Sequence, residues 1–245
     1  MGTSTTAAAG TTFLLARHGA TAHTAEGRLS GSTGANPPLS QVGREQARRL
    51  GAALRAAGGA DVLVCSPVLR ARQTAEEVAA ALGLALRVED DLREIDFGDW
   101  EGLTPAEVDR RWPGEQAAWR GQSEQAPPGG ESVEAVGDRV ARVRERLAAQ
   151  HPGARVLLVS HMYPVKLTVV DALGVPRVTM HRMHVDPTGL GEVRALPAGD
   201  PRGPWLVLRH NDAAHLRDAA HLRDAAHLRD AAQRIAPATA PPPAP

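Results

Sequence analysis

The 245-residue sequence contains one cysteine, Cys65, and one lysine, Lys166. A single cysteine excludes an internal disulfide framework and any zinc or iron–sulfur site built from cysteines. Basic and acidic side chains balance at 28 each, whereas a general nucleic-acid binder needs surplus basic charge to displace counterions from phosphates. No apolar run approaches the ~20 residues that a membrane-spanning helix requires. We therefore expect neither nucleic-acid nor membrane binding.

The two ends of the chain differ from the rest in composition. The first ten residues contain no lysine or arginine, so the charged start of a secretory signal is missing. We expect a flexible leader over residues 1–11 and a cytoplasmic location. Residues 214–231 hold three copies of Ala-His-Leu-Arg-Asp-Ala, and a Pro/Ala-rich segment follows. Helical positions six residues apart differ by about 240°, so these histidines share no face for a metal ion. We expect residues 213–245 to form a disordered or partly helical tail without a metal site.

Between these ends, short apolar runs alternate with segments of helical spacing. The runs predict strands at 13–16, 62–65, 85–88, 156–159, 178–196 and 205–209, with a hairpin turn at Thr188–Gly189. Helices are predicted from the cap Ser40 to the glycine pair at 58–59, and over 68–82 and 131–150. This alternation favours an α/β fold, three-layer α/β/α with a mainly parallel central sheet, in one domain over residues 12–212.

Polar residues that can bind an anion follow three of the predicted strands. Arg17 and His18 follow the first strand, Arg70 lies just beyond the second, and His161 ends a later one. Ligands of open α/β sheets bind at the carboxyl ends of the strands, so we expect these side chains to converge. Arginine presents a fork of donors to phosphate oxygens, and a neutral histidine can act as a nucleophile. Glu94, in a loop rich in glycine and aromatic residues, is a candidate acid for the leaving group.

The sequence resembles the histidine phosphatases, the phosphoglycerate mutase-like superfamily, in an ordered series of motifs. These are Arg17-His18-Gly19 with Thr21, residues 27–31 leading to Pro38-Leu39-Ser40, residues 66–75, Glu94 with residues 97–102, residues 128–132, and Val159-Ser160-His161. The resemblance covers residues 12–209 and looks most like actinobacterial acid phosphatases and relatives of α-ribazole phosphatase. That group includes the phosphatase half of ribonuclease–phosphatase fusions. Because the first predicted strand begins near the N-terminus, we expect a free-standing member.

The resemblance implies a phosphomonoesterase of acid-phosphatase type that acts on small phosphorylated metabolites without a metal or other cofactor. It implies three catalytic residues: His18 as the nucleophile that accepts the phosphoryl group, Glu94 as the proton donor, and His161. The implied phosphate contacts are Arg17, Arg70, Thr21, Thr24, Ser30, Gly31 and Met162. Thr24 stands where the family often has asparagine, and Met162 where it often has glycine. The resemblance leaves a homodimer open.

Other functions remain alternatives. A phosphoglycerate mutase needs a second anion site, but residues 100–130 contain three arginines, no lysine and five acidic residues. That balance predicts a negative wall and favours hydrolysis. A non-catalytic phosphate-binding module, or a scaffold that binds partners through the repeats, is also open. A cysteine phosphatase loop is disfavoured, because it needs arginine six positions after Cys65, where Ala71 stands, and because Pro67 lacks an N–H.

Overall fold

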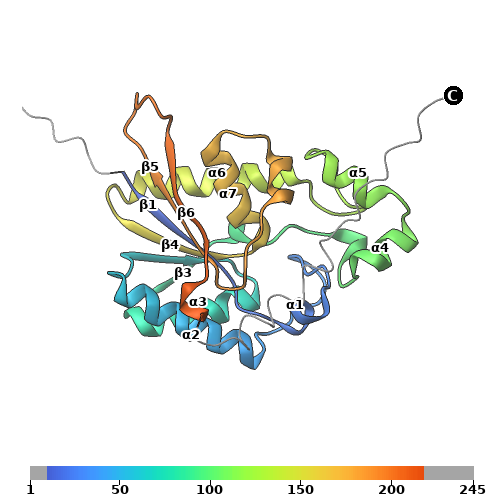
Figure 1. Cartoon of the computed structure of the whole chain (residues 1–245), viewed down its shortest axis with the longest axis horizontal. Helices are drawn as coiled ribbons and strands as arrows, with labels where there is room; N and C mark the ends of the chain where they lie inside the picture. Colours follow the sequence, from blue (N-terminus) through green and yellow to red (C-terminus); the bar gives the residue numbers. More distant parts are fainter. Residues whose placement is uncertain (1–9, 218–245) are drawn as a thin grey trace, which may run out of the picture.

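The computed structural model describes residues 10–217, so most of the expected leader and the tail from residue 218 onward lie outside the described residues. Six strands form one sheet in the order β3-β2-β4-β1-β5-β6 (Figure 1). The strands are β1 (Thr12–Arg17), β2 (Val62–Cys65), β3 (Leu86–Val88), β4 (Arg155–Ser160), β5 (Leu190–Ala195) and β6 (Trp205–Asp212). The strands β1 to β4 run parallel, and β5 is antiparallel to both β1 and β6. The expected mainly parallel sheet is confirmed.

Helices cover both faces of this sheet. They are α1 (Ala22–Glu26), α2 (Gln41–Ala56), α3 (Leu69–Leu82), α4 (Pro105–Arg111), α5 (Glu115–Gly121), α6 (Val133–Gln150) and α7 (Met162–Leu173). In Figure 1, α2 and α3 lie on one side of the sheet, and α6 and α7 lie on the other. This arrangement confirms the three-layer α/β/α fold. None of the helices between residues 10 and 217 has the length and apolar character needed to span a bilayer.

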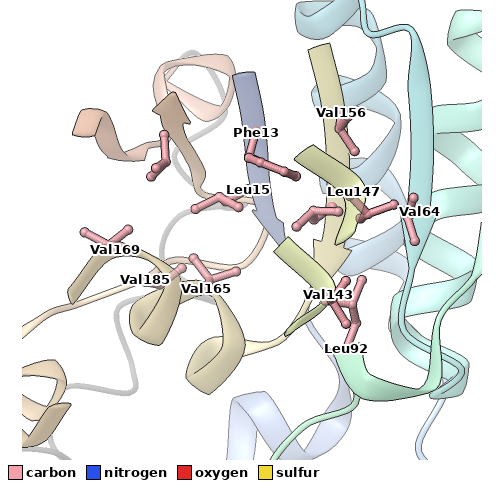
Figure 2. Packing of buried hydrophobic residues seen from close by; sticks show 12 residues of the cluster. Phe13, Leu15, Val64, Leu92, Val143, Leu147, Val156, Val165, Val169 and Val185 are labelled. Atoms are coloured by element: carbon pink, nitrogen blue, oxygen red, sulfur yellow. The ribbon is translucent and has the colours of Figure 1, made fainter. Parts of the chain in front are cut away.

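The alternation of side chains along β1 divides the core into two layers. Phe13 and Leu15 pack with residues of α6 and α7, as Figure 2 shows. Leu14 and Ala16 point to the other face and pack in the cluster that contains residues of α2 and α3. Successive side chains of a strand alternate between faces, so an uninterrupted apolar run marks a strand that is buried on both sides. Because β1 is buried on both faces, the strand ends where its apolar run ends, and polar residues follow it directly.

The expectation of a strand from residue 178 and of a hairpin at Thr188–Gly189 is wrong. Residues Arg177–Arg182 form a 3₁₀ helix, and β5 begins only at Leu190. Thr188 adopts a φ of 59°, and its N–H donates to the carbonyl of Arg17 in the turn that precedes β5. Pro187 lacks the N–H that a ladder needs, which explains why the extended run is interrupted here. Residues 196–204 join β5 to β6.

The packed part of the chain continues past Asp212 into the first copy of the six-residue repeat. Leu216 is fully buried and packs with Val42 and Ala213. Nε2 of His215 lies 3.0 Å from Oγ1 of Thr188. The first repeat copy therefore contributes a buried side chain to the domain, four residues beyond the boundary that we expected at residue 212.

Candidate active site

His18 follows β1 directly at the carboxyl edge of the sheet, and it is buried. Its Nδ1 lies 2.7 Å from the carbonyl oxygen of Gly19, which can only accept, so this nitrogen carries the proton. Nε of Arg70, which can only donate, lies 3.1 Å from Nε2 of His18. Burial, followed by the charges of Arg70 and Arg17, holds the pKa of His18 well below 6.5. His18 is therefore neutral, with its lone pair on Nε2.

Gly19 is required by a close approach of two backbone segments. A Cβ at this position would lie 2.4 Å from the carbonyl oxygen of Gly43, near the start of α2. Its N–H donates to Oγ1 of Thr74, at 3.0 Å. These contacts hold the chain immediately after His18 and therefore hold its carbonyl against Nδ1.

Arg70, in the first turn of α3, is fully buried beside His18. Its Nη2 donates to the carbonyls of Ser30 and Gly31, at 2.8 and 3.0 Å. Burial lowers its pKa to about 10, so the guanidinium stays charged at neutral pH. The arginine is thus fixed in place before any ligand binds.

Several buried polar atoms around His18 have no hydrogen-bond partner among the described residues. They are Nη1 of Arg70, Nε of Arg17, Nδ1 of His161 and Oγ of Ser30. Buried polar groups without a partner are rare in native proteins, because each one loses its hydrogen bonds to water. Donors grouped in this way suit the non-bridging oxygens of a phosphate group.

His161 is the residue immediately before α7, its side chain makes no capping hydrogen bond, and it is fully buried. Its ring lies edge-on to that of His18, with the centroids 5.1 Å apart. Nε2 of His161 lies 2.7 Å from Oγ of Ser66. Burial, and then the charge of Arg70, keeps the pKa of His161 well below 6.5. His161 is therefore neutral in the free protein, with one ring N–H to offer.

The carboxylate of Glu94 lies against the N-terminus of α7. Its Oε1 accepts the N–H groups of Ile95 and Tyr163, at 3.0 and 3.2 Å, and its Oε2 accepts the N–H of Met162, at 3.1 Å. Burial raises the pKa of Glu94, although the charge of Arg70 and these N–H groups act in the opposite direction. A carboxyl with a raised pKa can carry a proton at mildly acidic pH, as a general acid must.

Two of the expected phosphate contacts, Met162 and Gly31, donate their backbone N–H groups to carboxylates of the protein. The N–H of Met162 donates to Glu94, so it is not open to a phosphate. The N–H of Gly31 donates to Oε2 of Glu101 at 2.9 Å, and its carbonyl accepts from Arg70. A Cβ on Gly31 would lie 2.0 Å from Oε1 of Glu101, so the absence of a side chain allows this close packing. Gly31 therefore positions Arg70 instead of contacting the phosphate through its amide.

Thr21 and Thr24 form the N-terminal cap of α1. Oγ1 of Thr21 accepts the N–H of Thr24, and Oγ1 of Thr24 accepts the N–H of Thr21. The two hydroxyl oxygens lie 3.1 Å apart. Since only one of the two hydroxyl protons can lie between them, the other remains available to a ligand.

A cavity of about 150 Å³ adjoins these groups. Its lining comprises Arg17, His23, Thr24, Gly27, Arg28, Leu29, Pro105, Trp119, Arg120, Met162, Tyr163, Lys166, His181 and His184. From the segment 100–130, only Pro105, Trp119 and Arg120 belong to this lining, and none of the acidic residues of that segment does. The expected negative wall is therefore wrong for this cavity. The net charge of residues 100–130 did not predict which of their side chains line the cavity.

Sequence reasoning missed the residue that holds the Glu94 loop. Arg139 of α6 is buried, and it donates to the carbonyls of Asp91, Arg93 and Glu94 at 2.6, 2.7 and 3.1 Å. It also donates to both carboxylate oxygens of Glu131, each at 2.9 Å. The sequence feature that could have identified Arg139 is its position three residues after Val136, beside the apolar stripe of α6.

Arg139→Met should lower the free energy of unfolding by about 3–5 kcal/mol, because it leaves the carboxylate of Glu131 without its buried partner. Urea unfolding would measure this loss. Arg48→Met removes an exposed arginine that pairs with Glu77, and it should change stability by less than about 0.5 kcal/mol. Equal losses in the two variants would contradict the structural role of Arg139.

Comparisons with known proteins place this geometry in context. The family described as "Histidine phosphatase superfamily (branch 1)" matches residues 13–212. A bifunctional protein of Mycobacterium tuberculosis is 42% identical over 176 residues, which are 72% of this chain and 48% of that protein. A probable phosphoglycerate mutase of Salmonella paratyphi C is 30% identical over 207 residues, 82% of this chain and 93% of the relative. This chain thus spans about half the length of the first of these relatives.

Solved structures agree with the sequence matches. A mycobacterial glucosyl-3-phosphoglycerate phosphatase superposes with a TM-score of 0.73 at 28% identity, covering 82% of this chain and 99% of that one. A putative α-ribazole-5′-P phosphatase from Escherichia coli gives a TM-score of 0.71 at 28% identity, with 83% and 97% covered.

Proposed function

This chain belongs to the histidine phosphatase superfamily, and we propose that it hydrolyses small phosphomonoesters through a phosphohistidine at His18. The observation that carries the proposal is the buried, neutral ring of His18, whose Nε2 lone pair lies beside Arg70. The unpartnered donors around this ring support the same proposal. The names of similar proteins support hydrolysis of small phosphorylated substrates.

In the first step, Nε2 of His18 attacks phosphorus in line with the leaving oxygen, so that an N–P bond forms as the P–O bond breaks. The guanidinium groups of Arg17 and Arg70 neutralise the charge on the non-bridging oxygens, and the N–H of His161 donates a hydrogen bond that helps to orient them. In the free protein Nε of Arg70 donates to Nε2 of His18. A bound phosphate competes for this donor, and the lone pair becomes free to attack.

Glu94 completes both steps as the proton carrier. As the neutral acid it gives its proton to the leaving oxygen, and as the carboxylate it then takes a proton from water. That water attacks the phosphohistidine, breaks the N–P bond, and releases inorganic phosphate with His18 restored. Two in-line displacements retain the configuration at phosphorus. The positive charges that these steps require are supplied by the arginines of the chain.

The test is the release of inorganic phosphate from a panel of phosphomonoesters in the presence of EDTA. We expect turnover that EDTA does not reduce and that is fastest at mildly acidic pH. Absence of phosphate release from every member of the panel would contradict the proposal and would favour a phosphate-binding module.

Phosphoglycerate mutase activity is the second candidate, and the cationic lining of the cavity is the observation that favours it. A mutase must hold a bisphosphate intermediate and exclude water until the second transfer. Supplying 3-phosphoglycerate with catalytic 2,3-bisphosphoglycerate separates the two functions, because 2-phosphoglycerate and free phosphate can be followed together. Hydrolysis predicts that phosphate release is the faster process, and faster isomerisation would reject it.

A further inference from the structure

The segment at the end of the described chain docks onto the domain. Residues Ala214–Leu216 form a 3₁₀ turn that lies beside α2 (Figure 1). The side chain of Leu216 is fully buried and packs with Val42, the second residue of α2. We refer to residues 212–217 as the docking segment. Its buried leucine makes this segment part of the packed domain.

The docking segment also contacts the turn that holds Arg17, which comprises residues 185–189 and is called the Arg17 turn below. Nε2 of His215 lies 3.0 Å from Oγ1 of Thr188, and the N–H of Thr188 donates to the carbonyl of Arg17 at 3.0 Å. Nη1 of Arg17 donates to the carbonyl of Val185, at 2.7 Å. Thr188 has a φ of 59°, a conformation that β-branched residues rarely adopt, so its neighbours must hold it there. His215 supplies one of the contacts that do so.

The sequence contains the docking segment three times. Residues 212–217 read Asp-Ala-Ala-His-Leu-Arg, and residues 218–223 and 224–229 read the same. In the first copy, the leucine packs with Val42, the histidine contacts Thr188, and Oδ1 of the aspartate accepts the N–H of the second alanine at 2.8 Å. Every copy carries these side chains at the same spacing. The docking site, formed around Val42 and Thr188, therefore has three matching segments in one chain.

We propose that the docking site accepts any of the three copies, and that residues 218–223 of the same molecule occupy it and hold the Arg17 turn when the first copy is displaced. The exchange restores the same contacts and leaves a loop of six more residues after β6. The cost of this loop is modest, because loop-closure entropy grows only with the logarithm of length. A copy from a second molecule would also lose translational and rotational freedom, so docking within one molecule is favoured.

Amide hydrogen exchange in the Arg17 turn measures docking in the full chain and requires no activity. The N–H groups of Asp186 and Thr188 both donate within the domain, so their exchange rates report opening of the turn. Leu216→Ala should change these rates by less than about threefold, because the second copy replaces the first. The triple substitution Leu216→Ala, Leu222→Ala and Leu228→Ala weakens every copy and should speed exchange at least about tenfold.

The matched control for these variants is the double substitution Leu222→Ala with Leu228→Ala, which keeps the first copy and should exchange as the parent does. If Leu216→Ala alone speeds exchange as much as the triple substitution, the copies are not interchangeable and the proposal is overturned. Unchanged exchange in the triple variant would overturn it as well, because docking would then not hold the Arg17 turn.

Cross-linking identifies the copy that docks and the molecule from which it comes. In a Leu216→Ala background, a short bis-maleimide should join Val42→Cys to Leu222→Cys within one chain. Cys65 does not compete for the reagent, because it is buried and burial raises the pKa of its thiol to about 12.

The controls for this cross-link are Ala219→Cys and Ala225→Cys, which lie three residues to either side of Leu222. Each should react with Val42→Cys at least about fivefold more slowly, because neither position corresponds to the docked leucine. Equal rates at the three positions would show that a tethered chain reacts without docking and would overturn the proposal. A cross-link that joins two chains instead of closing within one would reject docking within the same molecule.

Discussion

His18→Ala should lower kcat/KM at least about 10⁴-fold for every phosphomonoester that the protein hydrolyses. The variant keeps the arginines and Glu94 but lacks the atom that forms the N–P bond. A neighbouring group cannot substitute readily, because Nε2 of His161 is already engaged with Ser66. Cys65 offers no nucleophile either, since burial raises the pKa of its thiol to about 12. Steady-state kinetics with a sensitive phosphate assay would measure the loss.

His151→Ala is the matched control for this variant, because His151 lies at the far end of α6 and belongs to neither the site nor the cavity. It should retain full activity. Thermal unfolding of both variants verifies that the fold is kept. Activity of the folded His18→Ala variant within about tenfold of the parent would rule out His18 as the nucleophile.

Glu94→Gln should have an effect that depends on the leaving group. With alkyl phosphates, whose leaving oxygen needs a proton, we expect kcat/KM to fall about 10²–10³-fold. With p-nitrophenyl phosphate, whose leaving group is stable as an anion, the fall should be less than about tenfold. Glu101→Gln is the control, since Glu101 also accepts two backbone N–H groups and burial also raises its pKa. It should alter both substrates by the same factor, and an equal loss on both substrates in Glu94→Gln would assign Glu94 a structural role.

The pH dependence of kcat/KM follows from the protonation states of Glu94 and His18. Glu94 must be protonated in the first step, so activity falls as the pH rises through its raised pKa. His18 must be neutral, so activity falls on the acidic side only below its depressed pKa. The expected optimum lies on the acidic side of neutral pH, and Glu94→Gln should remove the alkaline decline. Because the pKa of His161 is also depressed, protonation of His161 does not account for an acidic optimum.

Local patterns were sufficient to predict the strands at whose ends His18, Arg70 and His161 lie in the candidate site. The apolar runs of β1, β2 and β4 end at fixed points, and parallel strands end at the same edge of the sheet. Residues far apart in sequence, such as His18, Arg70 and His161, were therefore expected to meet, and the structure brings them into contact. The cap predicted at Ser40 marks the start of α2, where its side chain accepts the backbone N–H of Gly43.

Contacts between distant side chains could not be predicted in the same way. The helix α7 was not expected, because the almost uninterrupted apolar sequence after Met162 shows little periodicity. Without α7, the position of Glu94 at its N-terminus, and the loss of the Met162 amide to that carboxylate, were not apparent. The pairing of Arg139 with Glu131, and the inward face of Arg120, likewise depend on how α5 and α6 pack. The amino-acid composition of a single segment does not indicate how the helices α5 and α6 pack against the rest of the protein.

Trapping of the phosphoenzyme tests the central claim most directly. The Glu94→Gln variant, mixed with p-nitrophenyl phosphate, should complete the first step and accumulate the intermediate, because the attacking water lacks its base. Quenching in alkali and peptide mass spectrometry should then locate one phosphoryl group on His18, and this adduct should be lost in acid, as a phosphoramidate is. A phosphoryl group on any other residue, or an adduct that survives acid, would contradict a phosphohistidine mechanism at His18.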